Sequence, residues 1–135
     1  MPKKMIFKFA FLIFTFILFS DYTAQLQRHQ AVSSYIYNFA KNVQWKNEAD
    51  IQSFNFLVIG DDKQIISELK NLAGSKTLRG KPITILTGET SSNIRDAHLI
   101  FITKEVQSRH IDVFDKIEGK NKLLVSDGYK DKQLI

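Results

Sequence analysis

Acidic and hydroxyl side chains follow three apolar segments that we predict to be strands. Asp61 and Asp62 come directly after residues 54–59, and Thr103 and Asp127 follow two later segments of the same kind. The carboxyl ends of parallel strands meet at one edge of a sheet, and in open α/β sheets this edge forms the binding crevice. We therefore expect these four side chains to lie close together, where carboxylates could hold a cation or a cation-bearing ligand.

The acidic pair has two further interpretations. A carboxylate pair with a nearby hydroxyl is typical of magnesium-binding phospho-receiver domains, but these need a phospho-accepting aspartate after the central strand, where this chain has Thr103. The simpler interpretation is structural: Asp61 or Asp62 caps the following helix by accepting hydrogen bonds from its first backbone N–H groups. Helix capping is the interpretation that we favour.

Other residue types that carry chemistry are scattered. His29, His98 and His110 fall on different predicted elements and the chain has no cysteine, so we expect neither a metal site nor a cofactor. Ser108 lies two residues from His110 on a predicted helix, so the two side chains face different directions. No Gly-x-Ser-x-Gly motif or glycine-rich phosphate loop is present, and we predict no enzymatic activity.

Two more residues are candidates for contact with a partner or ligand. Trp45 follows the amphipathic helix predicted for residues 30–43. It is either a lid on the core or an exposed anchor, because tryptophan is enriched at binding hot spots. Arg79 lies in the polar connection of residues 75–81.

Short apolar segments alternate with amphipathic ones along the chain, which predicts an α/β fold. The expected sheet is mostly parallel and covered by helices on both faces, a three-layer sandwich. The predicted strands are residues 54–59, 82–87, 98–102 and 122–125. The predicted helices after the first are residues 63–74 and 104–118, with a loop or single helical turn over residues 88–96. We expect Thr103 to cap the helix over residues 104–118, and that helix to pack Val106, Ile111, Phe114 and Ile117.

The N-terminus has the order of a secretory signal peptide. Lys3 and Lys4 precede an apolar run over residues 5–19, and a polar stretch then leads to Ala24. We predict a signal peptide over residues 1–24 and a periplasmic protein without a stable membrane anchor; an uncleaved anchor is the alternative. Removing three lysines and one aspartate lowers the formal charge from +5 to +3.

Residues 25–135 are then expected to form one domain. Its mild charge and its lack of a basic run interleaved with aromatic residues argue against nucleic-acid binding. Leu134 and Ile135 look like the start of another strand. We expect the domain to be truncated at its C-terminal end, with an unpaired sheet edge and with homodimerisation as an option.

Five segments in order give the chain a family resemblance. They are residues 35–41 with Trp45, residues 56–61, residues 78–83, residues 98–102 and residues 123–127. Together they resemble the YfiR family of small exported bacterial proteins over nearly all of residues 30–128. The chain departs from the family pattern at Lys46, where proline is frequent, and at Ala97, where cysteine is frequent.

The resemblance implies a periplasmic regulatory protein that binds the periplasmic region of an inner-membrane signalling protein. That partner is a diguanylate cyclase, whose product is cyclic-di-GMP, or a sensor kinase. Without any thiol, redox control is not implied for this chain. The alternative function is a periplasmic domain that senses a small ligand at the predicted crevice.

Overall fold

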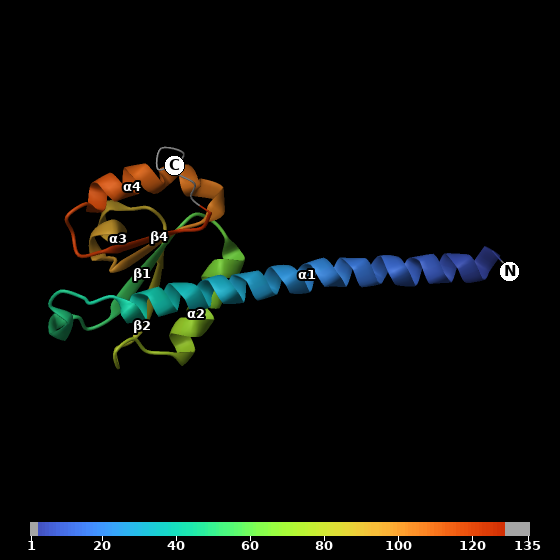
Figure 1. Ribbon diagram of the computed structural model, residues 1–135, viewed down its shortest axis with the longest axis horizontal. Coiled ribbons are helices and arrows are strands. Elements are labelled where there is room, and N and C mark those ends of the chain that lie inside the picture. Colours follow the sequence, from blue (N-terminus) through green and yellow to red (C-terminus); the bar gives the residue numbers. More distant parts are fainter. Residues whose placement is uncertain (1–2, 129–135) are drawn as a thin grey trace.

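A four-stranded parallel sheet forms the centre of the molecule, with helices on both faces (Figure 1). The computed structural model describes residues 3–128, apart from the side chains of residues 5–21. In chain order the elements are α1 (Lys3–Asn42), η1 (Glu48–Asp50), β1 (Phe54–Ile59), α2 (Lys63–Ser75), β2 (Ile83–Thr87), α3 (Ser91–Asp96), β3 (Leu99–Ile102), η2 (Lys104–Arg109), α4 (His110–Ile117) and β4 (Leu123–Ser126).

The strands run in the order β2-β1-β3-β4 and every neighbouring pair is parallel. From β1 the chain first adds β2 on one side and then crosses to add β3 and β4 on the other side. The strand order therefore reverses between the neighbouring strands β1 and β3. The carboxyl ends of those two strands therefore form the switch point at which doubly wound sheets bind ligands. The α/β fold predicted from the sequence is confirmed.

Each face of the sheet has its own apolar core. On one face, α1 and α2 pack against Phe54, Phe56 and Val58 of β1. On the other face, α3 and α4 pack against Leu57 of β1 and Ile100 of β3. The strands carry apolar residues on both faces because both faces are covered, which confirms the three-layer arrangement.

Helix α1 is much longer than the sequence pattern predicted. It runs from Lys3 to Asn42 and projects well beyond the rest of the domain on its N-terminal side (Figure 1). Among residues with described side chains, no helix is long and apolar enough to cross a membrane. Signal cleavage after Ala24 and the signal peptide itself stay predictions, and the predicted truncation falls outside the described residues.

The segment predicted as one helix over residues 104–118 is divided. A 3₁₀ helix, η2, precedes α4, and η2 is itself kinked at Val106, which has φ −118° and ψ 24°, outside the helical region. Helix α4 directs Val113 and Ile117 into the core, whereas Ile111 and Phe114, which the pattern predicted to be packed, are 50% and 44% exposed. The prediction is therefore confirmed for Ile117 and wrong for Ile111 and Phe114.

Candidate functional site

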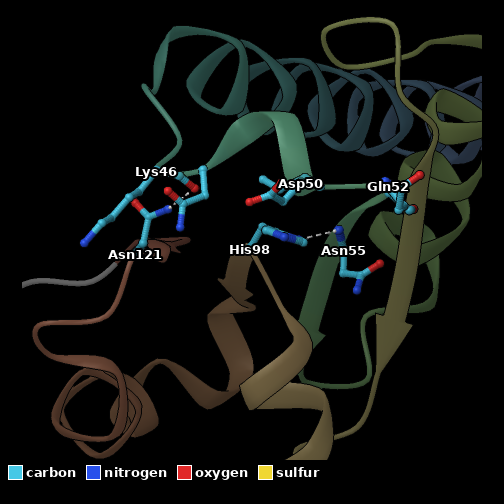
Figure 2. A pocket seen from close by; sticks show the side chains of 9 residues that line it. Lys46, Asp50, Gln52, Asn55, His98 and Asn121 are labelled. Atoms are coloured by element: carbon cyan, nitrogen blue, oxygen red, sulfur yellow. Dashed lines mark hydrogen bonds between the residues drawn. The ribbon is translucent and has the colours of Figure 1, made fainter.

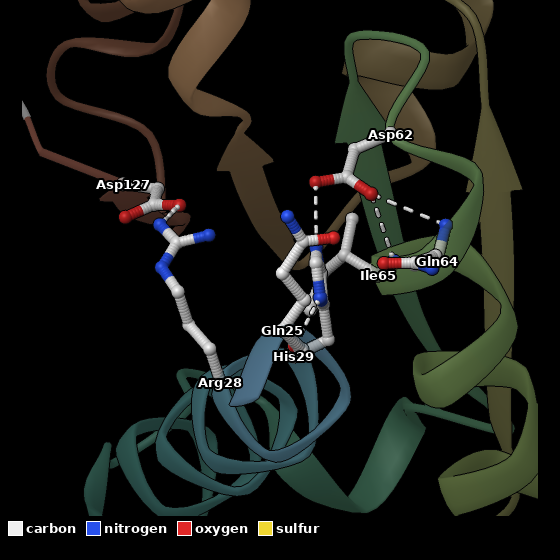
Figure 3. Close-up of polar contacts among 7 residues, drawn as sticks. All are labelled: Gln25, Arg28, His29, Asp62, Gln64, Ile65 and Asp127. Carbon is white, nitrogen blue, oxygen red and sulfur yellow. Dashed lines mark hydrogen bonds and ion pairs between the residues drawn. The ribbon is translucent and has the colours of Figure 1, made fainter. Parts of the chain in front are cut away.

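The carboxyl edge of the sheet brings together the acidic and hydroxyl residues predicted from the sequence. Asp62 precedes α2, Thr103 follows β3 and Asp127 follows β4, whereas Asp61 is exposed beside them. Helix α1 reaches the same edge and places basic side chains on two of the carboxylates (Figure 3).

Asp62 joins α1 to α2. One carboxylate oxygen accepts hydrogen bonds from the backbone N–H groups of Gln64 and Ile65, both at 3.1 Å, which caps α2 as the capping interpretation predicted. The other oxygen lies 3.2 Å from Nε2 of His29, whose Nδ1 lies 2.7 Å from the carbonyl oxygen of Gln25 (Figure 3). Asp62 therefore has a structural role that binds two helices together.

Replacing Asp62 with alanine is expected to destabilise the fold by about 1–2 kcal/mol, because capping residues contribute about this much. The variant also loses the contact with His29. Urea unfolding followed by circular dichroism measures the change. Asp61→Ala is the matched control: Asp61 is exposed, and we expect a change within about 0.5 kcal/mol. Equal losses in the two variants would contradict the capping role.

Asp127 is held by the second basic residue of α1. Nη2 of Arg28 donates to Oδ2 of Asp127 at 2.6 Å, although the two residues are 99 positions apart in sequence. Arg28 is 47% exposed at its side chain, so this pair contributes little stability, on the order of 0–1 kcal/mol. The pair shows that α1 lies beside the end of β4.

Thr103 fills the switch point between β1 and β3. Gly60 has φ +117°, and a Cβ atom built there would lie 1.8 Å from Oγ1 of Thr103. Thr103 is buried, and its Oγ1 has no hydrogen-bond partner among the described residues. The prediction that its side chain caps the following helix is therefore wrong. Thr103 and the α1 side chains of Arg28 and His29 therefore lie at the crevice predicted for a ligand.

Trp45 and Arg79 lie away from this edge and have structural partners. Trp45 is 5% exposed, packs against the rings of Phe54 and His98, and donates from Nε1 to the carbonyl oxygen of Ala40 at 3.1 Å. This favours the core role that the sequence left open for Trp45.

Arg79 has φ +52° and, together with Gly80 (φ +76°), forms a two-residue turn with left-handed backbone. It donates to the carbonyl oxygens of Lys41 and Val43 at 3.3 and 2.9 Å. These bonds satisfy backbone acceptors at the end of α1.

A pocket of about 530 Å³ lies at the opposite, amino edge of the sheet (Figure 2). His98 lines this pocket, although the sequence indicated no role for it beyond being one of three scattered histidines. Its Nδ1 accepts a hydrogen bond from the backbone N–H of Asn55 at 3.0 Å, which leaves the proton of the neutral ring on Nε2. Asp50 and Asn121 also line the pocket, and among the residues that line it only Ile51 has an apolar side chain.

The environment of His98 predicts acid sensitivity. Burial, and then the charge of Lys122, lower the pKa of His98 below its ordinary 6.5. The unfolded chain therefore binds a proton more readily, so the free energy of unfolding should fall as the pH drops through 6.5 toward the lowered pKa. His98→Asn keeps an oxygen that can accept from Asn55 and removes the titration. Denaturant unfolding at several pH values should show a shallower acid loss for this variant; equal slopes would contradict the assignment.

Large apolar side chains are exposed on the helices that flank β4. Tyr35 and Phe39 of α1 are 61% and 52% exposed and lie one helical turn apart on one face. On the other face of the sheet, Ile111 and Phe114 of α4 are also large exposed apolar residues. Exposed apolar side chains of this size are candidates for contact with another protein.

The comparison with family models decides the classification. The YfiR/HmsC-like model matches residues 29–133. The chain belongs to the YfiR/HmsC-like family. Proteins of this family are periplasmic regulators of cyclic-di-GMP signalling, with regulatory rather than catalytic domains. No curated protein and no solved structure matches the chain significantly.

The YfiR/HmsC-like match starts at His29, the residue of α1 that contacts Asp62. No local pattern in the sequence predicts the contacts of Arg28 and His29, because their partners are 99 and 33 positions away. Within the described residues with side chains, no group of three or more histidine, aspartate and glutamate residues is arranged to hold a metal ion.

Proposed function

We propose that this YfiR/HmsC-like chain is exported and regulates an inner-membrane signalling protein by binding that protein's periplasmic region. The target is a diguanylate cyclase or a sensor kinase. Membership of a family of periplasmic regulators is the observation that carries the proposal. The exposed rings of Tyr35 and Phe39 support a mechanism through protein contact, because aromatic side chains are enriched at the centres of interfaces.

The contacts that α1 makes with the rest of the domain support its use as a binding surface. Its contacts with Asp62, Asp127 and Arg79 hold the helix at three places, so the rings of Tyr35 and Phe39 project from a fixed element. A fixed surface loses little conformational entropy when a partner binds.

The test measures cellular cyclic-di-GMP and capture of the membrane partner. A deletion strain is complemented with the wild type, with Tyr35→Ala/Phe39→Ala, or with Ser34→Ala, an exposed α1 residue, as the control. We expect the double variant to bind the signalling protein at least about tenfold more weakly and to behave like the deletion, as for hot-spot aromatic residues. Unchanged cyclic-di-GMP on deletion, together with recovery of no signalling enzyme, would refute the proposal.

One observation favours a second candidate, the sensing of a small polar ligand. The pocket beside His98 has a volume within the usual range for ligand sites. A ligand that binds only the folded protein must raise its melting temperature. A thermal-shift screen of polar metabolites, repeated with His98→Asn, would support this candidate if a shift is lost in the variant.

A further inference from the structure

Gln25 becomes the first residue of the chain when the predicted signal peptide is removed after Ala24. Most of the part of α1 that projects from the domain in Figure 1 then leaves with the signal peptide. The contacts of α1 with the carboxyl edge of the sheet remain, because Arg28 and His29 make them. The new N-terminus therefore lies within about one helical turn of the residues that fix α1 to the sheet.

An N-terminal glutamine carries two groups that react with each other. The α-amino nitrogen attacks Cδ of the same residue, an N–Cδ bond forms and the Cδ–Nε2 bond breaks. The side-chain nitrogen leaves as ammonia with a proton from the α-amino group, and a five-membered lactam, a pyroglutamyl residue, remains. The reaction consumes no co-reactant. Like acetylation, it removes the positive charge of the N-terminus.

The position of Gln25 in the fold permits this reaction. Gln25 is exposed. Its contact with His29 is made by the backbone carbonyl oxygen, which lies 2.7 Å from Nδ1 of His29 and takes no part in the ring (Figure 3). The first N–H groups of a helix have no partner within the helix, so turning the α-amino group into a lactam N–H costs no helical hydrogen bond.

The electrostatics of this end of α1 favour the neutral ring. A charged α-amino group would stand at the positive end of the helix dipole. Arg28 and the ring of His29 lie three and four positions further on, on the same side of the helix. The two carboxylates that α1 contacts are already bonded, Asp127 to Arg28 and Asp62 to the first turn of α2 and to His29. Loss of the charge therefore removes a repulsion.

We propose that Gln25 is converted to a pyroglutamyl residue after export, which blocks and neutralises the N-terminus of the domain. The inference rests on the export that the proposed function requires. It is independent of the proposed contacts of Tyr35 and Phe39 with a signalling protein.

Mass spectrometry of the N-terminal tryptic peptide is the test. The protein is purified from the cell envelope of its native host and digested with trypsin, which cleaves after Arg28, so the N-terminal peptide covers residues 25–28. We expect this peptide to be lighter by one ammonia than the synthetic peptide with a free α-amino group. The intact protein should also resist a general aminopeptidase until a pyroglutamyl aminopeptidase has removed its first residue.

Gln25→Asn is the matched control. Asparagine keeps the amide and the exposed position but is one methylene shorter, so the corresponding lactam would be a strained four-membered ring. We expect the variant to be cleaved after Ala24, to keep a free α-amino group and to be open to the aminopeptidase without prior treatment. Resistance of both proteins to the aminopeptidase would contradict a block by the ring.

Three results would overturn the proposal. The first is an N-terminal peptide with free Gln25. The second is an N-terminus at another residue, and the third is an uncleaved chain in the membrane fraction. None of these three decides whether the chain regulates a signalling protein, which is tested separately by cyclic-di-GMP on deletion, so the two failures can be told apart.

Discussion

Replacing Trp45 with alanine is expected to cost about 3–5 kcal/mol of folding free energy, the usual range for removing a large buried aromatic side chain. Trp45 is 5% exposed and contacts Phe54 at 5.7 Å and His98 at 6.2 Å between ring centroids. The variant leaves a cavity between α1 and the sheet and removes the hydrogen bond to Ala40. Since domains of this size are stable by only about 5–15 kcal/mol, the loss is a large fraction of the total.

Urea unfolding followed by circular dichroism measures this loss. Fluorescence cannot follow the variant in the same way, because Trp45 is the single tryptophan of the chain. Tyr35→Ala is the matched control: this ring is 61% exposed, and we expect a change within about 0.5 kcal/mol. A loss below about 1 kcal/mol for Trp45→Ala would show that Trp45 is not part of the core.

The strands could be predicted from sequence because both of their faces are buried. Phe54–Ile59 forms β1 with the bounds that its apolar run predicted, and each of the other strands differs from its prediction by one residue at one or both ends. The cap on α2 was equally local, since Asp62 bonds to residues only two and three positions away. An apolar run and a helix cap can be predicted because the residues that cause them are neighbours in the sequence.

The site contacts could not be predicted because they join distant parts of the chain. His29 and Asp62 are 33 positions apart, and Arg28 and Asp127 are 99 apart. No local pattern indicates that α1 lies across the carboxyl edge of the sheet. The prediction that Ile111 and Phe114 are packed was wrong for another reason. Helix α4 is short and has apolar residues on both sides, so periodicity alone does not show that Val113 is buried and Ile111 and Phe114 are exposed.

Gly60 gives the second large effect. Gly60→Ala is expected to destabilise the fold by roughly 3–5 kcal/mol, because overpacking and backbone strain contribute about 1–3 kcal/mol each. The new Cβ would lie 1.8 Å from Oγ1 and 2.9 Å from Cβ of Thr103, and the φ of +117° is one that alanine rarely adopts. Either β1 and β3 must separate at their carboxyl ends or the side chain of Thr103 must leave its buried position.

The control and a double-mutant cycle separate these causes. Gly74→Ala lies in α2 with open space around the new methyl group, so it should be neutral or stabilising by up to about 1 kcal/mol. Thr103→Ala removes Oγ1 and should recover part of the loss in the double variant, whereas the strain from φ remains. If the two single losses simply add, Gly60 and Thr103 do not pack against each other. A measurable coupling would establish that Gly60 and Thr103 pack against each other at the carboxyl ends of β1 and β3, so that a glycine is needed at position 60 because of the threonine as well as because of its φ.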